Sequence, residues 1–173
     1  LHTRCINYQL VKYCSALCEV EFVAKSGKLI SALGFKNDKG GYEMRNKFTK
    51  LSISPKTIST IPGESDSLNV FEGFMDYLSA LTYYKVKQLD GTTIILNGVG
   101  QKKQLIEAVP NYDQVILFGD NDTTGVEFAE EVNNKHSNVL NMADEVYPKF
   151  KDFNVFLCKV IKDNDLPISH ASN

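Results

Sequence analysis

Residues 67–76 read Ser-Leu-Asn-Val-Phe-Glu-Gly-Phe-Met-Asp, and residues 114–125 read Gln-Val-Ile-Leu-Phe-Gly-Asp-Asn-Asp-Thr-Thr-Gly. In both stretches a short apolar run ends at acidic residues and a glycine. This pattern is typical of a buried strand that turns into a helix. It predicts an α/β fold in which Glu72 and Asp120 follow the ends of two strands.

The chain around these stretches alternates between strand and helix patterns. Strands are predicted over residues 68–71, 93–96, 115–118 and 138–140, and helices over residues 74–84, 102–109, 126–134 and 153–161. Repeated strand–helix units of this length favour a parallel sheet that is covered by helices on both faces.

A domain boundary is predicted at residues 62–67, where turn-forming and small polar residues follow one another. Two short strands over residues 18–23 and 29–35, with glycine-containing turns, indicate a small β-rich or α+β unit before it. We therefore predict two units, residues 1–66 and residues 67–173.

Charge is distributed unevenly between these units. The chain has a net charge of -2, but residues 1–66 hold ten Lys and Arg against six Asp and Glu, and residues 67–173 hold nine against fifteen. The two balances are therefore +4 and -6. A surface that contacts phosphates needs such a basic cluster, although solvated surfaces also carry them. The clustered residues are Lys36, Lys39, Arg45, Lys47, Lys50 and Lys56.

Composition excludes several classes of protein. A chain of 173 residues with 43% hydrophobic and 23% charged residues is typical of globular proteins. No stretch approaches about 18 uninterrupted apolar residues, and the N-terminus lacks a secretion signal, so we expect a cytoplasmic protein without membrane contact. Four cysteines and three histidines are too scattered for zinc, and reduced thiols are expected. Because Leu1 is not Met, we expect further residues before it in the natural protein.

Acidic residues gather at the predicted strand ends. Asp76 lies one helical turn after Glu72 on the same side of its helix, and Asp122 follows Asp120 closely. If the first and third strands of the parallel sheet are neighbours, three or four carboxylates converge where such sheets bind ligands. Carboxylates without nearby His or Cys favour Mg²⁺ or Mn²⁺, which serve phosphate chemistry. Taken singly, an acidic residue at a helix start also stabilises the helix.

Two other motifs fit residues 120–125 formally. A calcium-binding EF-hand loop has the right spacing, but it must follow a helix, and Glu127 stands where an apolar residue is expected. The Asp-x-Asp-x-Thr motif of haloacid-dehalogenase phosphatases also fits Asp120, Asp122 and Thr124. That family normally carries the motif on its first strand, and only 48 residues remain after Gly125 for its other catalytic segments.

The acidic segments resemble the Toprim domain, a metal-binding fold of bacterial primases, topoisomerases and some nucleases. Its signature is a Glu after the first strand and an Asp-x-Asp after the third, and both are present. Residues 70–76, 96–100 and 118–125 resemble the Glu-Gly-Tyr-Met-Asp, Gly-Thr and Asp-x-Asp-x-x-Gly segments of the primase branch. Residues 151–154 resemble its later Lys-Asp-x-Asp motif, with Asn154 in place of the second acid.

The resemblance extends upstream and covers residues from about 20 to 161. Residues 33–36 and 41–46, followed by Lys50, resemble the basic subdomain that precedes Toprim in primases. In detail they are most similar to primase-like proteins of mobilisable and conjugative elements. The primase zinc-binding module and a helicase-binding segment are not present in this sequence, so we expect the core of a longer primase-like protein.

The resemblance implies roles for particular residues. Three carboxylates are expected to be catalytic, namely Glu72, Asp120 and Asp122. The expected ligands of Mg²⁺ or Mn²⁺ are Glu72, Asp76, Asp120, Asp122 and Asp152. Nucleic-acid or nucleotide phosphates are expected to contact Lys36, Arg45, Asn46, Lys47 and Lys50.

The function that the resemblance implies is metal-dependent nucleotidyl transfer that makes RNA primers on single-stranded DNA for a mobile element. Single-stranded DNA and nucleoside triphosphates are the expected partners, together with a replicative helicase or mobilisation proteins. A metal-dependent Toprim nuclease and a nucleic-acid-binding module without robust catalysis are the alternatives.

Aromatic residues allow two interpretations. Three of them lie among the basic residues and are expected to pack in the core, with stacking on nucleic-acid bases as the alternative: Phe35, Tyr42 and Phe48. Three tyrosines fall in the predicted helix over residues 74–84 and are interpreted as structural rather than as topoisomerase nucleophiles: Tyr77, Tyr83 and Tyr84.

Overall fold

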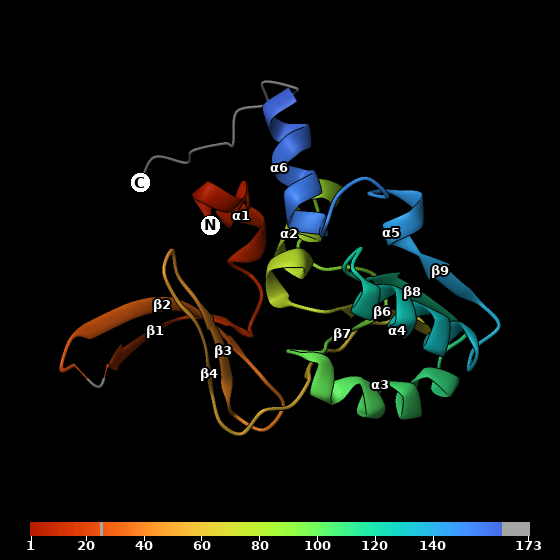
Figure 1. Cartoon of the computed structure of the whole chain (residues 1–173), viewed down its shortest axis with the longest axis horizontal. Coiled ribbons are helices and arrows are strands. Elements are labelled where there is room, and N and C mark those ends of the chain that lie inside the picture. The colour runs from red at the N-terminus through yellow and green to blue at the C-terminus, as the bar shows by residue number, and fades with distance from the viewer. Residues whose placement is uncertain (25, 164–173) are drawn as a thin grey trace.

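A computed structural model describes residues 1–24 and 26–163, and it contains two β-sheets with helices packed around the second (Figure 1). The last ten residues of the predicted second unit, 164–173, lie outside the described residues. In the described part of the chain, no helix has the length and apolar character that crossing a membrane requires.

The first sheet is antiparallel, with strands in the order β1-β2-β3-β4. A short 3₁₀ helix and a one-turn α-helix precede it: η1 (His2–Arg4) and α1 (Tyr8–Val11). The strands are β1 (Leu17–Val23), β2 (Leu29–Lys36), β3 (Tyr42–Arg45) and β4 (Lys50–Ile53). The predicted β-rich unit is therefore present, and its two predicted strands agree with β1 and β2 within one residue.

The second sheet has the order β5-β7-β6-β8-β9, and β7, β6, β8 and β9 are parallel. Its strands are β5 (Ser59–Ile61), β6 (Ser67–Phe71), β7 (Thr92–Ile95), β8 (Gln114–Phe118) and β9 (Val139–Asn141). β5 was not predicted, and it pairs with β7 in the antiparallel direction. β5 precedes Pro62 but belongs to the second sheet, so the chain enters this sheet before the predicted boundary. The division between residues 66 and 67 stays a prediction.

Helices cover both faces of the second sheet, as predicted (Figure 1). One face is covered by α2 (Phe74–Tyr84), α5 (Met142–Glu145) and α6 (Phe153–Asp163). The other is covered by α3 (Lys102–Ala108), with η2 (Val99–Gln101) and η3 (Val109–Asn111) at its ends, and by α4 (Thr123–Asn133). The α/β fold class is thereby confirmed.

Alternation along the strands explains why both faces are covered. Successive residues of a strand point to opposite faces, so Val70 packs under α3 and α4 while Phe71 packs under α2 and α6. Both side chains are at most 2% exposed. A strand with two buried faces appears in the sequence as a continuous apolar run.

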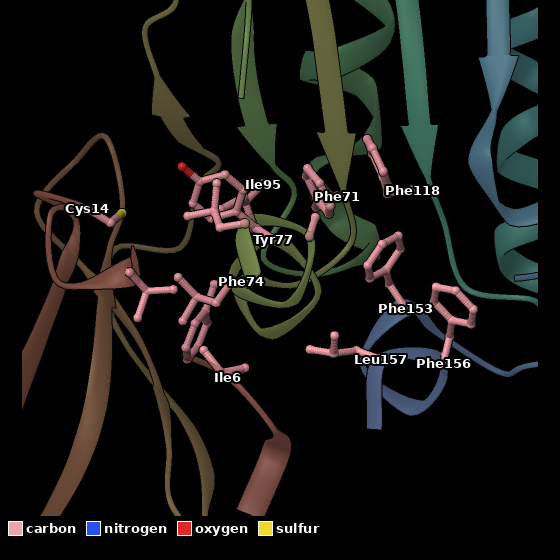
Figure 2. Close-up of a cluster of buried hydrophobic side chains, with 14 of the residues drawn as sticks. Ile6, Cys14, Phe71, Phe74, Tyr77, Ile95, Phe118, Phe153, Phe156 and Leu157 are labelled. Atoms are coloured by element: carbon pink, nitrogen blue, oxygen red, sulfur yellow. The ribbon is translucent and has the colours of Figure 1, made fainter. Parts of the chain in front are cut away.

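The α2–α6 core also includes the N-terminal unit (Figure 2). Ile6 and Cys14, from the segment before β1, belong to the same buried cluster as Phe71 and Phe118. The ring of Phe35, on β2, stacks on Phe74 of α2 with centroids 5.1 Å apart. The two sheets are thus joined through one hydrophobic core, which holds the antiparallel sheet against the start of α2.

Gly125 allows α4 to begin immediately beside the main chain of Asp120. A Cβ atom at this position would overlap the main-chain oxygen of Asp120. The helix starts three residues earlier than predicted because the Asp122 side chain accepts a hydrogen bond from the Gly125 amide at 3.0 Å and caps it.

Substitution of Gly125 by alanine is expected to lower the free energy of unfolding by about 1–3 kcal/mol, because the added methyl group must displace the backbone. Urea unfolding measures this loss. Gly119→Ala is the matched control, since its added Cβ meets no atom within 4 Å. A similar change in both variants would contradict the packing explanation.

Candidate functional site

A cleft of about 410 Å³ lies where the antiparallel sheet meets the carboxyl ends of the parallel strands. Its lining combines two groups of opposite charge. The acidic residues are Glu72, Asp76, Asp120 and Asp152, together with Glu43. The basic residues are Arg4, Arg45, Lys50, Lys56 and Lys151.

Parallel pairing brings Glu72 and Asp120 to the same edge of the sheet. β6 and β8 are neighbours, as the sequence hypothesis required, and Phe71 pairs in register with Phe118. Glu72 directly follows Phe71, and Asp120 follows Phe118 after a glycine. Both side chains are half-buried and line the cleft.

Asp76 and Asp152 come from the first turn of α2 and from the residue before α6. Oδ1 of Asp76 accepts a hydrogen bond from the main-chain N–H of Asn154 at 3.1 Å, which ties the two helix starts together. Oδ1 of Asp152 accepts from the N–H of Val155 at 2.7 Å and caps α6. Each carboxylate therefore keeps a second oxygen for other contacts.

Burial and crowding raise the pKa values of Asp76, Asp120 and Glu72. Burial, followed by repulsion from Asp152 and Asp120, raises the pKa of Asp76 to about 7. Burial, followed by repulsion from Glu72 and Asp152, raises the pKa of Asp120 to about 6. The pKa of Glu72 is also raised, by burial first and then by Asp122. The cleft is thus a place where added positive charge would be favourable.

Asn121, between the two aspartates of the Asp-x-Asp motif, holds the loop that carries Asp152. Its Nδ2 donates hydrogen bonds to the carbonyl oxygens of Tyr147 and Phe150 at 2.9 and 2.8 Å. Its main-chain N–H donates to the carbonyl of Lys151 at 2.7 Å. Nothing in the local sequence pattern indicated this role, because the partners lie 26 or more residues away.

Asp122 occupies a different position from the other acidic residues. It is exposed, caps α4 through Gly125 and is not among the residues that line the cleft. Its charge nevertheless contributes to the raised pKa of Glu72. Its catalytic and metal-binding roles stay predictions.

Asn154, which replaces the expected acid, points away from the cleft and anchors the N-terminus. Its side chain is buried, and Nδ2 donates to the carbonyl of Arg4 at 2.9 Å and to Oγ of Ser79 at 2.8 Å. Its Oδ1 accepts from Nη1 of Arg4 at 2.9 Å. A carboxylate has no donor for the Arg4 carbonyl or the serine, so the amide suits this contact.

The predicted phosphate-binding residues divide into two groups. Arg45 and Lys50 line the cleft, and the Arg45 guanidinium lies 5.8 Å from the centroid of Phe74. Burial, only partly offset by Glu43, lowers the pKa of Arg45. Three other predicted residues are not among those that line the cleft: Lys36, Asn46 and Lys47. Three basic lining residues were not among the predicted phosphate-binding residues, although Lys56 belonged to the basic cluster identified in the sequence: Arg4, Lys56 and Lys151.

The hairpin between β3 and β4 presents an exposed aromatic ring. Phe48 is 88% exposed, so the expectation that it packs in the core was wrong. Asn46 fixes this turn, because its Oδ1 accepts from the Phe48 amide at 2.9 Å and its Nδ2 donates to the carbonyl of Ser31 at 3.0 Å. Phe35 is fully buried as expected, and Tyr42 is half-buried.

The tyrosines of α2 pack against other aromatic rings. Tyr77 is 1% exposed and lies edge-on to Phe71, with centroids 5.5 Å apart. Tyr83 packs against Phe153 in the same manner, with centroids 5.6 Å apart. These contacts agree with the structural interpretation of the tyrosines.

The donor set fits a hard divalent cation that also binds phosphate. Within residues 1–24 and 26–163, no three His, Cys, Asp or Glu side chains are grouped closely enough to form a ready-made metal site. Mg²⁺ is commonly held by one or two carboxylates, with water and substrate phosphates completing its coordination. Oxygen-only ligands that repel one another, as at Glu72 and Asp120, suit that mode of binding.

Residues 69–157 match the sequence family described as Toprim-like, which is more than half of the chain. The protein belongs to the Toprim-like family. Residues 1–54, which end just after β4, match a domain of unknown function, DUF8464. No curated protein sequence matches the chain.

Solved structures share the fold of the Toprim-like domain and of the sheet before it. The primase fragment of the bacteriophage T7 primase–helicase protein matches with a TM-score of 0.64 and 18% identity, over 98% of this chain and 72% of that one. A chain matches equally well, with a TM-score of 0.64, in a structure of the T7 lagging-strand DNA polymerase with primase domains of two gp4 subunits. That match has 19% identity over 95% of this chain and 86% of that one.

Replacing Asp76 with asparagine is expected to stabilise the metal-free Toprim-like domain at pH 8. A raised pKa means that the folded protein keeps a proton that the unfolded chain releases near pH 4, so stability falls as pH rises from about 4 to about 7. Asp76→Asn should reduce this fall and raise the free energy of unfolding at pH 8 in EDTA by on the order of 1 kcal/mol.

Urea unfolding at pH 5 and pH 8 checks this pH dependence. Glu127→Gln, an exposed change on α4, is the control and should leave the pH dependence as it is. An Asp76→Asn variant that loses as much stability as the wild type between the two pH values would contradict the raised pKa of Asp76.

Proposed function

We propose that the protein is the catalytic core of a primase-like enzyme that joins ribonucleotides on single-stranded DNA by metal-dependent nucleotidyl transfer. The observation that supports this most is the cleft itself, where carboxylates from the Toprim-like domain face cations from the antiparallel sheet. Binding of a nucleoside triphosphate would use both groups: the carboxylates would hold a metal ion, and the metal ion and the basic side chains together would neutralise the charge of the phosphates.

The carboxylates would hold the cation. Asp120 and Glu72 lie at adjacent strand ends, and Asp76 and Asp152 lie on the neighbouring helix starts. When bound, divalent ions supply stabilisation of the charge that develops on the entering and leaving oxygens. The raised pKa of Asp120 would fall again when a cation is present.

The basic side of the cleft would bind and orient the phosphates. Arg45 is held by a hydrogen bond from Nη1 to the carbonyl of Met44 at 2.9 Å and by its packing on Phe74. A guanidinium fixed in this way can contact phosphate oxygens with two parallel hydrogen bonds. Lys50 and Lys56, on and after β4, add charge along the same wall.

The β3–β4 hairpin would guide the single strand toward the cleft. Phe48 stands exposed at its turn, Lys47 Nζ lies 5.6 Å from the ring centroid, and Arg45 and Lys50 form the pair of strand residues that closes the turn. An exposed aromatic ring beside basic residues is how many proteins hold unpaired bases without sequence preference.

The T7 structure described above contains primase domains bound to an RNA/DNA hybrid and dTTP, together with a DNA polymerase. We extend from it only the expectation that this chain acts on a nucleic-acid strand. Partnership with a helicase or mobilisation proteins, the mobile-element origin and the cytoplasmic location remain predictions.

Asp120→Ala is expected to reduce RNA oligomer synthesis at least about 100-fold, because a cation-binding oxygen pair is removed from the reaction centre. The assay contains single-stranded DNA, ribonucleoside triphosphates and Mg²⁺ or Mn²⁺, and labelled products are separated on a gel. Asp113→Ala is the control and should retain synthesis, because Asp113 directly precedes β8, at the end of the strand opposite to Asp120.

Normal synthesis by a folded Asp120→Ala variant would contradict the proposed site. Shortened DNA instead of new oligomers would indicate a Toprim nuclease. DNA binding with neither product would indicate a binding module.

Phe48→Ala is expected to weaken binding of single-stranded DNA by roughly 5- to 150-fold, the equivalent of about 1–3 kcal/mol for one stacked base. Fluorescence anisotropy over a series of salt concentrations measures the affinity for single-stranded DNA. The slope of affinity against salt should stay unchanged for Phe48→Ala and should fall by about one for Lys47→Ala.

Leu29→Ala is the matched control, since Leu29 is an exposed apolar residue of the same sheet that lies on β2, outside the β3–β4 hairpin. Equal affinities of the Phe48→Ala and wild-type proteins would contradict the role of the hairpin.

A further inference from the structure

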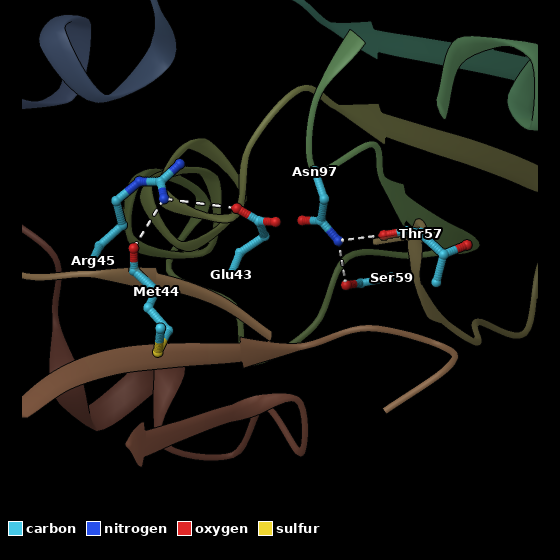
Figure 3. A network of polar contacts seen from close by, with 6 residues as sticks. All are labelled: Glu43, Met44, Arg45, Thr57, Ser59 and Asn97. Carbon is cyan, nitrogen blue, oxygen red and sulfur yellow. Dashed lines mark hydrogen bonds and ion pairs between the residues drawn. The ribbon is translucent and has the colours of Figure 1, made fainter. Parts of the chain in front are cut away.

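Two acceptor groups line the cleft in addition to the four carboxylates considered above (Figure 3). They are the carboxylate of Glu43, on β3, and the side-chain carbonyl of Asn97, in the loop after β7. Glu43 is 5% exposed, and Oδ1 of Asn97 is buried without a hydrogen-bond partner among the described residues. Figure 3 shows this oxygen directed toward Glu43.

The orientation of the Asn97 amide is fixed by its nitrogen. Nδ2 donates hydrogen bonds to the carbonyl of Thr57 at 3.0 Å and to Oγ of Ser59 at 2.8 Å. Turning the amide over would place an acceptor against the Thr57 carbonyl, and the Ser59 hydroxyl could not replace the other bond because it already donates to the carbonyl of Lys36 at 2.9 Å. Oδ1 must therefore face the cleft side.

The Glu43 carboxylate keeps hydrogen-bonding capacity on the same side. Its Oε2 lies 3.7 Å from Nη1 of Arg45, which is an ion pair longer than a hydrogen bond. The same nitrogen donates its hydrogen bond to the Met44 carbonyl instead. A carboxylate accepts through both oxygens, so Glu43 can receive a donor from the cleft.

Buried acceptors are nearly always paired with a donor, and a molecule that fills the cleft can supply one to Glu43 and Asn97. Phosphate oxygens are excluded, because they are acceptors and carry the same charge as Glu43. Sugar hydroxyls are neutral donors, and an acidic residue takes the ribose 2′-hydroxyl in dinucleotide-binding sheets. Resting on the proposed function, we infer that the 2′-hydroxyl of the incoming nucleotide donates its hydrogen bond to Glu43, while the neighbouring 3′-hydroxyl can donate to Asn97, and that the contact with Glu43 selects ribonucleotides over deoxyribonucleotides.

Selection by this contact does not depend on the base, because every ribonucleotide carries the same hydroxyl. A nucleotide without that hydroxyl leaves the buried Glu43 carboxylate without this donor, which is how sites built around a hydroxyl reject analogues that lack it. A cation held at the same place would instead favour the triphosphates of both sugars alike.

Calorimetric titration of the whole chain with ATP and with 2′-deoxyATP, in the presence of Mg²⁺, tests the inference. The wild type is expected to bind ATP at least about 10-fold more tightly, with a similar ratio for GTP and 2′-deoxyGTP. In Glu43→Gln the affinities for ATP and 2′-deoxyATP are expected to lie within about threefold of each other, since one acceptor oxygen becomes an N–H donor. Glu21→Gln, an exposed change on β1, should keep the wild-type ratio.

A measurement on the wild type alone covers the case in which Glu43→Gln does not fold. ATP that carries fluorine in place of the 2′-hydroxyl has a small substituent that cannot donate a hydrogen bond. Its affinity should match that of 2′-deoxyATP rather than that of ATP. Binding equal to that of ATP would overturn the inference.

The ratio of the affinities for ATP and 2′-deoxyATP tests this inference separately from the proposed function. If Glu43→Gln weakens ATP and 2′-deoxyATP by the same factor, Glu43 acts only through Arg45 on the phosphates, and the inference fails while the proposed function stands. If the wild type binds neither triphosphate at millimolar concentration, the proposed function fails, and the inference with it.

Discussion

Phe71 and Phe118 pair in register at the ends of β6 and β8, and their rings stack with centroids 4.3 Å apart. Glu72 and Asp120 follow these rings, so burial of two apolar side chains sets two carboxylates at one edge of the sheet. Burial raises the pKa of both groups, and repulsion from Glu72 adds to the rise at Asp120. Hydrophobic packing thus holds together charges that repel, and a bound cation would relieve the repulsion.

The cleft is composite, because both sheets supply charged residues to it. Arg45 and Glu43 come from the antiparallel sheet, whereas Glu72 and Asp120 follow strands of the parallel one. The stacked rings of Phe35 and Phe74 and the hydrogen bonds between Arg4 and Asn154 fix one sheet relative to the other. Neither unit alone would present the whole site.

The local sequence pattern was sufficient to predict those helices and strands that bury a periodic apolar face. Helix α2 spans Phe74–Tyr84, the same residues as the sequence predicts, because its apolar spacing and the preceding glycine mark both ends. Strand β5 has three residues and depends on pairing with β7, which no local signal reveals. For the same reason the contact of Arg4 with Asn154, 150 residues apart, and the exposure of Phe48 became visible only in three dimensions.

A crystal structure with Mn²⁺ and a nucleoside triphosphate, examined by anomalous scattering, tests the central claim most directly. Mn²⁺ is expected in the cleft, in contact with a carboxylate oxygen of Asp120 and with the phosphates, while Arg45 contacts the same phosphates from the opposite wall. A nucleotide bound in the cleft without Mn²⁺ at millimolar concentration, or Mn²⁺ bound only elsewhere on the protein, would contradict it.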